Sequence, residues 1–361
     1  MNTDDVILIV ANSGRMLAQF LSAVGFSVVV IDCYADKDMQ SSAQDWLKIS
    51  ALRPGEVGAA FQQLAQRNRL SHVIYGSGLE SYPETLAFLE QSLLVLGNNY
   101  SAFTDVLDKP AFFSLLDSLS IDHPEVSFVT PGNSDGWLVK SFYGEGGAHI
   151  KKATVNNQVR GYWQRFVEGL SMSVLFVAGK DKIEIAGFHR QFCENNKEYP
   201  FLFSGVSDEV RLPEKFQRLV TGWVEKLACH YQLRGLNSLD FIFDGQNCYV
   251  LEINARPSAS LQLYEKKLIC SHIQTCLGNQ PEIIYNSKNF AAYKVVYAPF
   301  DLRVKNCHWP DWALDCPVPF TKIKKGEPLC SIVEPFPTSK PPDDNLEKKQ
   351  QQIVELMTDR Y

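Results

Sequence analysis

The chain has 361 residues, enough for two or three domains that each bury a sizeable core. It is 45% hydrophobic and 21% charged, which is typical of a globular protein rather than a disordered or fibrous one. The net charge of −6 and the lack of a long basic run argue against nucleic acid or an anionic membrane as the main partner.

Several features favour a cytoplasmic protein. The first five residues include two acids and lead directly into an apolar run, unlike a signal peptide. No stretch approaches the 18 consecutive apolar residues of a membrane span. Nine scattered cysteines fit a reducing compartment. Three Cys/His neighbours lack the spacing of a structural zinc site, so packing is the better interpretation; they are Cys229-His230, Cys270-Ser271-His272 and Cys307-His308.

The first hundred residues predict a parallel α/β domain over residues 1–102. An apolar run at 6–10, a helix-like stretch and a strand at 26–31 form a β-loop-α-β unit. It lacks Gly-x-Gly-x-x-Gly, which argues against a Rossmann dinucleotide site. A further strand at 72–75 runs into a Gly-Ser-Gly turn. Because ligands bind in loops after parallel strands, Glu80 in this turn is a candidate for substrate contact, with a plain tight turn as the simpler interpretation.

A glycine-rich turn follows, beyond two helices separated by Lys109-Pro110. The predicted strands 137–140 and 148–152 are joined by Tyr143-Gly144-Glu145-Gly146-Gly147. Successive glycines let backbone N–H groups turn inward and hold an anion, but no Gly-Lys-Ser/Thr follows, so the turn is not a P-loop. It is either a flap over phosphates, with Lys140 reaching in from the preceding strand, or a flexible hairpin tip.

We expect the central domain to span residues 103–287, with a flap subdomain at about 108–165. Within it, 195–204 predicts a mobile aromatic loop. From residue 288 the character changes to short strands and prolines, which predicts a small C-terminal domain over 288–361 with a terminal helix at 346–357.

Residues 236–256 predict two strands joined by a tight turn at Asp244-Gly245-Gln246-Asn247. By the period-2 rule, each strand has an apolar and a polar face. The apolar face comprises Leu239, Phe241, Phe243, Leu251, Ile253 and Ala255; the polar face comprises Asp240, Asp244, Glu252, Asn254 and Arg256.

If residues 245–247 form a three-residue loop, Asp240 lies directly opposite Glu252, with Cβ atoms roughly 5 Å apart. Like charges at that distance repel, so the pair calls for a cation. Two carboxylates and an amide oxygen suit Mg²⁺, which keeps its other positions for water and phosphate. The alternative is an ordinary hairpin with one polar, wet face, and the hairpin alone does not decide between them.

In chain order, these motifs resemble the ATP-grasp superfamily of carboxylate–amine ligases over nearly the full length. The Glu-x-Asn-x-Arg run, twelve residues after an acid in a strand, is the most specific of them. The motifs are Asp108-Lys109, Val139-Lys140 before Gly144-Glu145-Gly146-Gly147, Gln164-Arg165-Phe166-Val167-Glu168-Gly169, Ser238-Leu239-Asp240-Phe241 and Leu251-Glu252-Ile253-Asn254-Ala255-Arg256.

The resemblance implies an N-terminal parallel α/β domain, then an ATP-grasp fold with a flap subdomain and an antiparallel sheet, then a short C-terminal extension. It implies an ADP-forming ligase that uses ATP and Mg²⁺, or Mn²⁺, to activate a carboxylate as an acyl phosphate and join it to an amine. The expected partners are ATP, a small-molecule carboxylate and an amine; a homodimer is a further expectation.

Each site residue receives a role by the same resemblance. Lys109 and Lys140 would contact ATP from two sides. The flap would be Gly144, Glu145, Gly146 and Gly147, and the strand holding adenine would be Gln164, Arg165, Phe166 and Val167. Asp240, Glu252 and Asn254 would bind Mg²⁺. Arg256 would steady the transferred phosphoryl group or the substrate carboxylate.

One departure concerns the ribose. Many family members place a glutamate two residues after the hinge glycine, where this chain has Ser171, so Glu168 is the substitute. Arg190 is a further candidate for phosphate contact. The run Asp32-Cys33-Tyr34-Ala35-Asp36 resembles a branch similar to tyramine–glutamate ligases of methanofuran-type, one-carbon cofactor biosynthesis. Aromatic residues such as Phe201 would then face an aromatic amine, although ordinary packing is the favoured interpretation.

Phosphoryl transfer to a carboxylate brings two anions together, so two lysines, an arginine and Mg²⁺ suit it, and a flap would exclude water from the acyl phosphate. A metal-dependent hydrolase would not explain the flap or the paired lysines. A non-catalytic nucleotide-binding module and a ligase of another small-molecule pathway are the alternatives.

Overall fold

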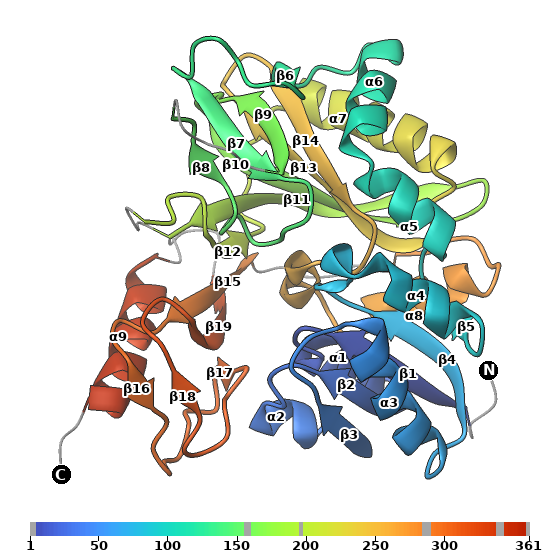
Figure 1. The fold of residues 1–361 in the computed structure, drawn as a ribbon, viewed down its shortest axis with the longest axis vertical. Coiled ribbons are helices and arrows are strands. Elements are labelled where there is room, and N and C mark those ends of the chain that lie inside the picture. Colours follow the sequence, from blue (N-terminus) through green and yellow to red (C-terminus); the bar gives the residue numbers. More distant parts are fainter. Residues whose placement is uncertain (1–4, 155–159, 195–197, 284–289, 337–342, 359–361) are drawn as a thin grey trace.

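Three large sheets organise the protein. The computed structural model describes residues 5–154, 160–194, 198–283, 290–336 and 343–358, and within them a five-stranded, an eight-stranded and a four-stranded sheet form, with a two-stranded sheet beside them. The fold is mixed α/β, as the sequence predicts (Figure 1).

The N-terminal sheet is parallel throughout, with strand order β3-β2-β1-β4-β5. Its central strand is buried along its whole length, which explains the continuous apolar run Val-Ile-Leu-Ile-Val-Ala. The elements are β1 (Val6–Ala11), α1 (Arg15–Ala23), β2 (Ser27–Asp32), α2 (Lys37–Gln40), β3 (Asp45–Lys48), α3 (Pro54–Ala65), β4 (Leu70–Tyr75), α4 (Pro83–Glu90) and β5 (Leu94–Val95).

The sequence did not predict the strand β3 or the helices α2 and α3 of this part of the chain. The edge strand β3 reads Asp-Trp-Leu-Lys and is only partly buried, so it lacks the apolar run that marks its neighbours. The helix α2 is a single turn, too short to show a helical period.

The eight-stranded sheet is antiparallel, with order β14-β13-β10-β11-β12-β15-β19-β17. Its last three strands come from beyond residue 288, so the ladder continues from the predicted central domain into the predicted C-terminal one. The division into these domains stays a prediction. The strands are β10 (Leu170–Ala178), β11 (Ile183–Cys193), β12 (Phe203–Ser207), β13 (Gly235–Phe243), β14 (Cys248–Asn254), β15 (Phe290–Tyr297), β17 (Ala313–Leu314) and β19 (Pro328–Phe336).

The four-stranded sheet, order β6-β9-β7-β8, lies above the eight-stranded one in Figure 1 and has its own small apolar cluster of Trp137, Val139 and Trp163. Its ladder does not join the larger sheet in the described residues. Its strands are β6 (Val126–Ser127), β7 (Trp137–Ser141), β8 (Lys151–Lys152) and β9 (Gly161–Arg165).

Helices α5 (Tyr100–Leu107) and α6 (Lys109–Ser118) follow the N-terminal sheet, and the break between them falls at Asp108, next to the predicted Lys109-Pro110. Asp108 caps α6 by accepting the N–H of Ala111 at 3.0 Å. The remaining elements are α7 (Glu214–His230), α8 (Leu268–Cys276), α9 (Asp343–Thr358), β16 (Leu302–Arg303) and β18 (Lys322–Ile323). None of the helices in the described residues has the length and apolar character to cross a membrane.

A buried polar network joins the N-terminal sheet to the end of β14. The hydroxyl of Tyr75 donates to the carbonyls of Asn98 and Ala255, each at 3.0 Å. The side-chain amide of Asn98 donates to the same Ala255 carbonyl at 2.9 Å and to Asn237 at 2.7 Å. The network therefore fixes the strand that carries the predicted metal ligands against the N-terminal sheet.

Candidate active site

A cleft of about 990 Å³ lies where the three large sheets meet. Its walls come from the loops after β1, β2 and β4, the turn between β7 and β8, the β13–β14 hairpin and the C-terminal strands. It gathers most of the residues singled out in the sequence: Lys109, Lys140, Gly144, Glu145, Gly146, Gly147, Gln164, Arg165, Phe166, Val167, Asp240, Glu252, Asn254 and Arg256.

The two acids of the hairpin face each other as expected, because Asp240 pairs with Glu252 across β13 and β14. The turn that produces this register differs from the expected one. Phe243 pairs with Cys248, so the turn has four residues rather than three, and on its own it would place Asp240 out of register with Glu252.

A bulge in β14 restores the pairing. The register shifts between Asp240 and Phe241, and the extra residue on the partner strand is Leu251. As a consequence, Val250 rather than Leu251 packs into the core beside Phe241. Leu251 lines the cleft instead, which corrects its predicted place on the apolar face.

The two carboxylates have different surroundings. Asp240 accepts hydrogen bonds from the side-chain amides of Gln191 and Asn254, each at 3.1 Å. Burial and the charge of Glu252 still raise the pKa of Asp240 to about 7. Burial also opposes the ionisation of Glu252, but Lys109, whose Nζ lies 3.2 Å away, helps to hold the pKa of Glu252 below its usual value.

Lys140 enters the same space from β7, where it is buried. Burial lowers the pKa of Lys140 to about 8; the charge of Glu252 opposes this shift and that of Lys109 adds to it. The two lysines thus flank one carboxylate and present their charge toward the cleft.

The glycine turn packs directly against residues 201–203. The N–H of Phe203 donates to the carbonyl of Gly146 at 2.8 Å. A Cβ on Gly147, which has a φ of +74°, would lie 1.9 Å from the carbonyl oxygen of Phe201. A Cβ on Gly144 would lie 2.5 Å from His149. Two of these glycines are therefore required by close approach, and one also by a left-handed backbone.

Arg256 reaches the N-terminal domain. It forms an ion pair with Glu80, whose other oxygen accepts the N–H of Gly78 at 2.8 Å. Its Nη2 donates to the side-chain Oδ1 of Asn254 at 3.3 Å. The glycine turn is tied to the N-terminal part of the chain as well, because the side-chain amide of Asn12 donates to Glu145. Burial and the charge of Glu80 raise the pKa of Glu145 to about 7.

Residues 106–260 match the family model described as "ATP-grasp domain". This stretch of the chain is similar to the ATP-grasp domain family. Over 355 residues it is 19% identical to an uncharacterized protein of Methanocaldococcus jannaschii, with 90% of this chain and 87% of that protein covered. It is 22% identical over 204 residues to the carbamoyl phosphate synthase large chain of Thermus thermophilus; this covers 50% of this chain but 20% of that protein.

Solved structures share the fold. The biotin carboxylase domain of the Hydrogenobacter thermophilus 2-oxoglutarate carboxylase, in complex with MgADP, ADP and bicarbonate, superposes with a TM-score of 0.72 at 12% identity and covers 92% of this chain and 86% of that one. The N5-carboxyaminoimidazole synthetase of Staphylococcus aureus, complexed with ADP, has a TM-score of 0.71 at 15% identity, with 97% and 98% covered. The fold of the ATP-grasp neighbours is thus the fold of this chain.

The strand that the resemblance assigns to adenine is β9, which lies within the matched stretch. Gln164 on it is buried, and within the described chain its side-chain nitrogen has no hydrogen-bond partner, so a donor is available in the cleft. Arg165 is held by the carbonyl of Asp135 at 2.7 Å and lies 4.4 Å from the ring centroid of Trp137. Phe166 is 52% exposed, as expected for a ring that a flat ligand would cover.

The β13–β14 hairpin supplies only part of the ligand set that a metal ion needs. No group of three or more His, Cys, Asp and Glu side chains is arranged to hold a metal ion in the part of the chain described here. Asp240, Glu252 and the amide oxygen of Asn254 supply part of an oxygen shell, and Mg²⁺ ordinarily fills the rest with water and phosphate. These residues therefore fit a magnesium ion that arrives with a nucleotide.

Two predicted residues do not reach the cleft. Glu168 and Arg190 are exposed and do not line it. The guanidinium of Arg190 lies 5.2 Å from the ring centroid of Phe192 instead. At the position of the family glutamate, Ser171 donates to Gln191 at 2.9 Å. We leave Glu168 and Arg190 out of the proposed site.

Sequence reasoning missed other residues that line the cleft. Gln191 holds both Ser171 and Asp240 but belongs to no motif. His149 lines the cleft from the far side of the glycine turn, and its Nδ1 is buried without a partner within the described chain. Its place directly after a glycine turn was the available signal.

Proposed function

We propose that this protein is an ATP- and Mg²⁺-dependent ligase that joins a small-molecule carboxylate to an amine. The observation that carries the proposal is the opposition of Asp240 and Glu252 in a cleft that also holds two lysines and an arginine. Two facing carboxylates are repulsive by themselves and become favourable with a cation between them. Free thiols at all nine cysteines agree with the expected cytoplasmic location.

In the proposed reaction, the γ-phosphoryl group of ATP moves to an oxygen of the carboxylate, which gives ADP and an acyl phosphate. The nitrogen of the amine then attacks the acyl carbon, phosphate leaves, and the nitrogen loses a proton to form the amide. Mg²⁺ held by Asp240, Glu252 and Asn254 would supply charge neutralisation at the phosphates.

The protein residues have defined tasks in this scheme. Lys109 and Lys140 offset the charge of the two anions that must meet. Arg256, oriented by Glu80 and Asn254, steadies the transferred group or the carboxylate. The closed glycine turn excludes water, which would otherwise hydrolyse the acyl phosphate.

The substrates belong to the finer part of the proposal. We propose glutamate and an aromatic amine in the biosynthesis of a methanofuran-type one-carbon cofactor, on the likeness of the run from Asp32 to Asp36 to that branch. A homodimer is also proposed. These points await a direct test, whereas the ligase chemistry is supported by the arrangement of the cleft.

The test is a phosphate-release screen with MgATP against a matrix of carboxylates and primary amines, including glutamate with tyramine-like acceptors. We expect ADP and phosphate only when acid and amine are both present, and at least ~100-fold less with Glu252→Gln, since a metal ligand is lost. Glu225→Gln, on an exposed position of α7, serves as the matched control with full activity.

Release of phosphate without any amine would instead indicate a hydrolase. Nucleotide binding without turnover for every pair would indicate a binding module. Activity of Glu252→Gln equal to that of the wild type would contradict the role given to the facing acids.

A further inference from the structure

The cleft continues away from the two facing acids to a second polar cluster. There the loop after β2, residues 32–38, meets the C-terminal strands, and the lining includes Arg15, Asp36, Gln262 and Asp315. The loop follows the carboxyl end of a parallel strand, where ligands of such sheets bind.

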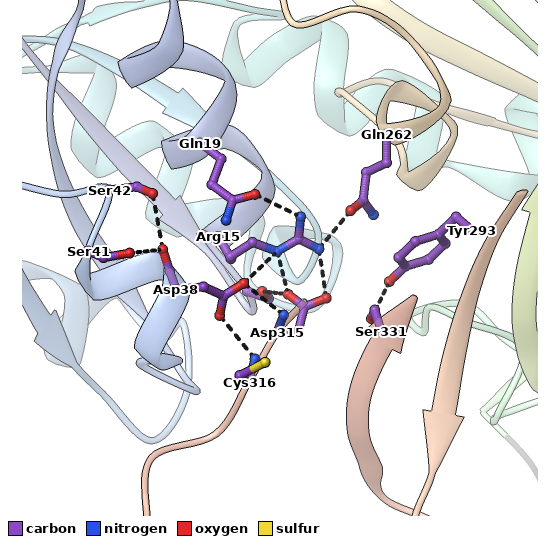
Figure 2. Close-up of polar contacts among 12 residues, drawn as sticks. Arg15, Gln19, Asp38, Ser41, Ser42, Gln262, Tyr293, Asp315, Cys316 and Ser331 are labelled. Carbon is purple, nitrogen blue, oxygen red and sulfur yellow. Dashed lines mark hydrogen bonds and ion pairs between the residues drawn. The ribbon is translucent and has the colours of Figure 1, made fainter. Parts of the chain in front are cut away.

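The arginine of this cluster is held by side chains of the protein. Arg15 is 2% exposed, and its guanidinium donates to both oxygens of Asp315, at 2.9 and 2.7 Å (Figure 2). Its Nη2, which already donates to Asp315, also donates to Gln262 at 2.6 Å, and its Nη1 donates to Gln19 at 3.4 Å. A substrate anion would have to break this set, so Arg15 serves the protein rather than a ligand.

Two acids of the loop are also fully used. Asp38 accepts the N–H groups of Asp315 and Cys316, each at 3.0 Å (Figure 2). Asp32 accepts the N–H groups of Gly14 at 3.2 Å and Ala35 at 2.8 Å. Both side chains hold backbone in place.

Asp36 differs from these neighbours. Its side chain is 4% exposed and lines the cleft, yet within the described residues it makes no hydrogen bond or ion pair. It occupies the N-cap position of α2, where an aspartate usually accepts a backbone N–H, and it does not do so. A buried carboxylate without a donor is costly, and burial with the nearby charges of Asp315 and Asp38 raises the pKa of Asp36 to about 8.

Three tyrosines line the same cleft. Tyr34, two residues away, is 44% exposed and lines the cleft, as do Tyr293 and Tyr297. The hydroxyls of the last two are already engaged, with Ser331 at 2.9 Å and with the Phe203 carbonyl at 2.6 Å, so their rings rather than their polar tips are what remains for a ligand. Tyrosine rings bind ammonium groups through cation–π contact.

We propose that this end of the cleft is the binding site for the amine substrate in its ammonium form, with Asp36 as its anchor and Tyr34 as part of its wall. The Asp36 carboxylate also takes the proton that the nitrogen must lose before it attacks the acyl carbon. The ammonium group donates hydrogen bonds to the Asp36 carboxylate and balances its negative charge. This inference rests on the proposed ligase function, which it sharpens by naming the form in which the amine docks and the residue that selects it.

The test uses the full chain in the presence of MgADP and three probes of one shape: 2-phenylethylamine, 2-phenylethanol and phenylacetate. Calorimetry measures their binding to the wild type, to Asp36→Asn, which keeps the volume and removes the charge, and to Tyr34→Ala. Asp311→Asn, at an exposed position outside the cleft, is the matched control.

We expect the wild type to bind the amine at least tenfold more tightly than the alcohol or the acid. Asp36→Asn should weaken amine binding about 10- to 100-fold, as for loss of a charged hydrogen bond, and leave the alcohol unchanged. Tyr34→Ala should weaken the amine severalfold, and Asp311→Asn should match the wild type.

Equal affinity of Asp36→Asn and the wild type for the amine overturns the proposal. So does a wild type that binds the alcohol or the acid as tightly, or that binds no amine while it binds MgADP. Thermal stabilisation by MgATP, recorded for each variant, separates this outcome from failure of the ligase function: a wild type that binds the amine but shows no ATP-dependent turnover retains the subsite and loses the reaction.

Discussion

Charge is closely matched around the facing acids. Lys109, Lys140 and Arg256 stand against Asp240, Glu252 and the two glutamates at positions 80 and 145. Burial and neighbouring acids raise the pKa of Asp240 and Glu145 to about 7, which reduces the excess of negative charge. A cation that binds between the acids would replace such a proton, so its affinity should rise with pH through this range.

Lys140 should impose a pH limit on the use of ATP. Because its pKa is lowered from 10.5 to about 8, the side chain is charged well below pH 8 and loses its charge as the pH rises through that value. The ratio kcat/KM for ATP should therefore fall above about pH 8. Arginine stays protonated, so Lys140→Arg should move the falling limb upward by at least ~1 pH unit.

The measurement is the pH profile of kcat/KM for ATP between about pH 6.5 and 9.5. Lys226→Arg, on the exposed side of α7, is the control and should leave the profile unchanged. An unshifted limb in Lys140→Arg would assign the titration to another group.

A site residue could be predicted from the sequence when it lay in a recognised motif. The two acids lie in strands whose alternation and spacing predicted that they face each other. That Lys109 and Lys140 would join them was implied by the family resemblance rather than by spacing. Glu168 and Arg190 lie in similar runs, but their exposure is decided by the packing of whole strands. Gln191 belongs to no motif, and Asp36 lies in a run that the sequence singled out without giving this residue a role. Their surroundings in the structure indicate what each can do.

At the scale of elements, the glycine turn between β7 and β8 depends on its contact with residues 201–203. Gly147→Ala would place a methyl group against the Phe201 carbonyl at a backbone angle that costs an L-residue about 1–2 kcal/mol. The closed flap should be lost in part. We expect a roughly tenfold rise in the KM for ATP and faster proteolysis within residues 143–147.

Gly132→Ala is the control for this change, since a Cβ there meets nothing within 4 Å and the backbone is not left-handed. Its kinetics and cleavage pattern should match those of the wild type. If Gly147→Ala behaves in the same way, the flap does not rely on this contact.

The hairpin shows where element-level prediction stops. The alternation of side chains indicated the two strands and their polar face, and the pairing of Asp240 with Glu252 is confirmed. The turn length and the face of Leu251 were wrong, because a bulge changes both without altering the composition. Such compensation depends on cross-strand hydrogen bonds that the sequence does not display.

At the scale of the whole molecule, Arg15 ties the first helix to a loop three hundred residues later in the chain. Removing one partner of a buried ion pair costs about 3–5 kcal/mol, because the other charge is left without compensation. Arg15→Met should lower the free energy of unfolding, measured in urea at pH 7, by about this amount. Arg15 holds the pKa of Asp315 below its usual value, against the effect of burial. The ionised Asp315 therefore contributes stability at pH values above its usual pKa.

Arg53→Met provides the comparison, because Arg53 and Glu56 form an exposed pair on one helix end and should contribute less than about 1 kcal/mol. Equal effects of the two substitutions would show that the Arg15 tie adds no more than a surface pair.

The unbroken ladder from β14 to β17 has a mechanical consequence. It carries the facing acids near one end and the strands bearing Tyr293 and Ser331 near the other, so these two walls of the cleft belong to one continuous sheet. The ladder of the smaller β6–β9 sheet is separate from it in the described residues, so a shift of the smaller sheet would leave the large ladder unbroken.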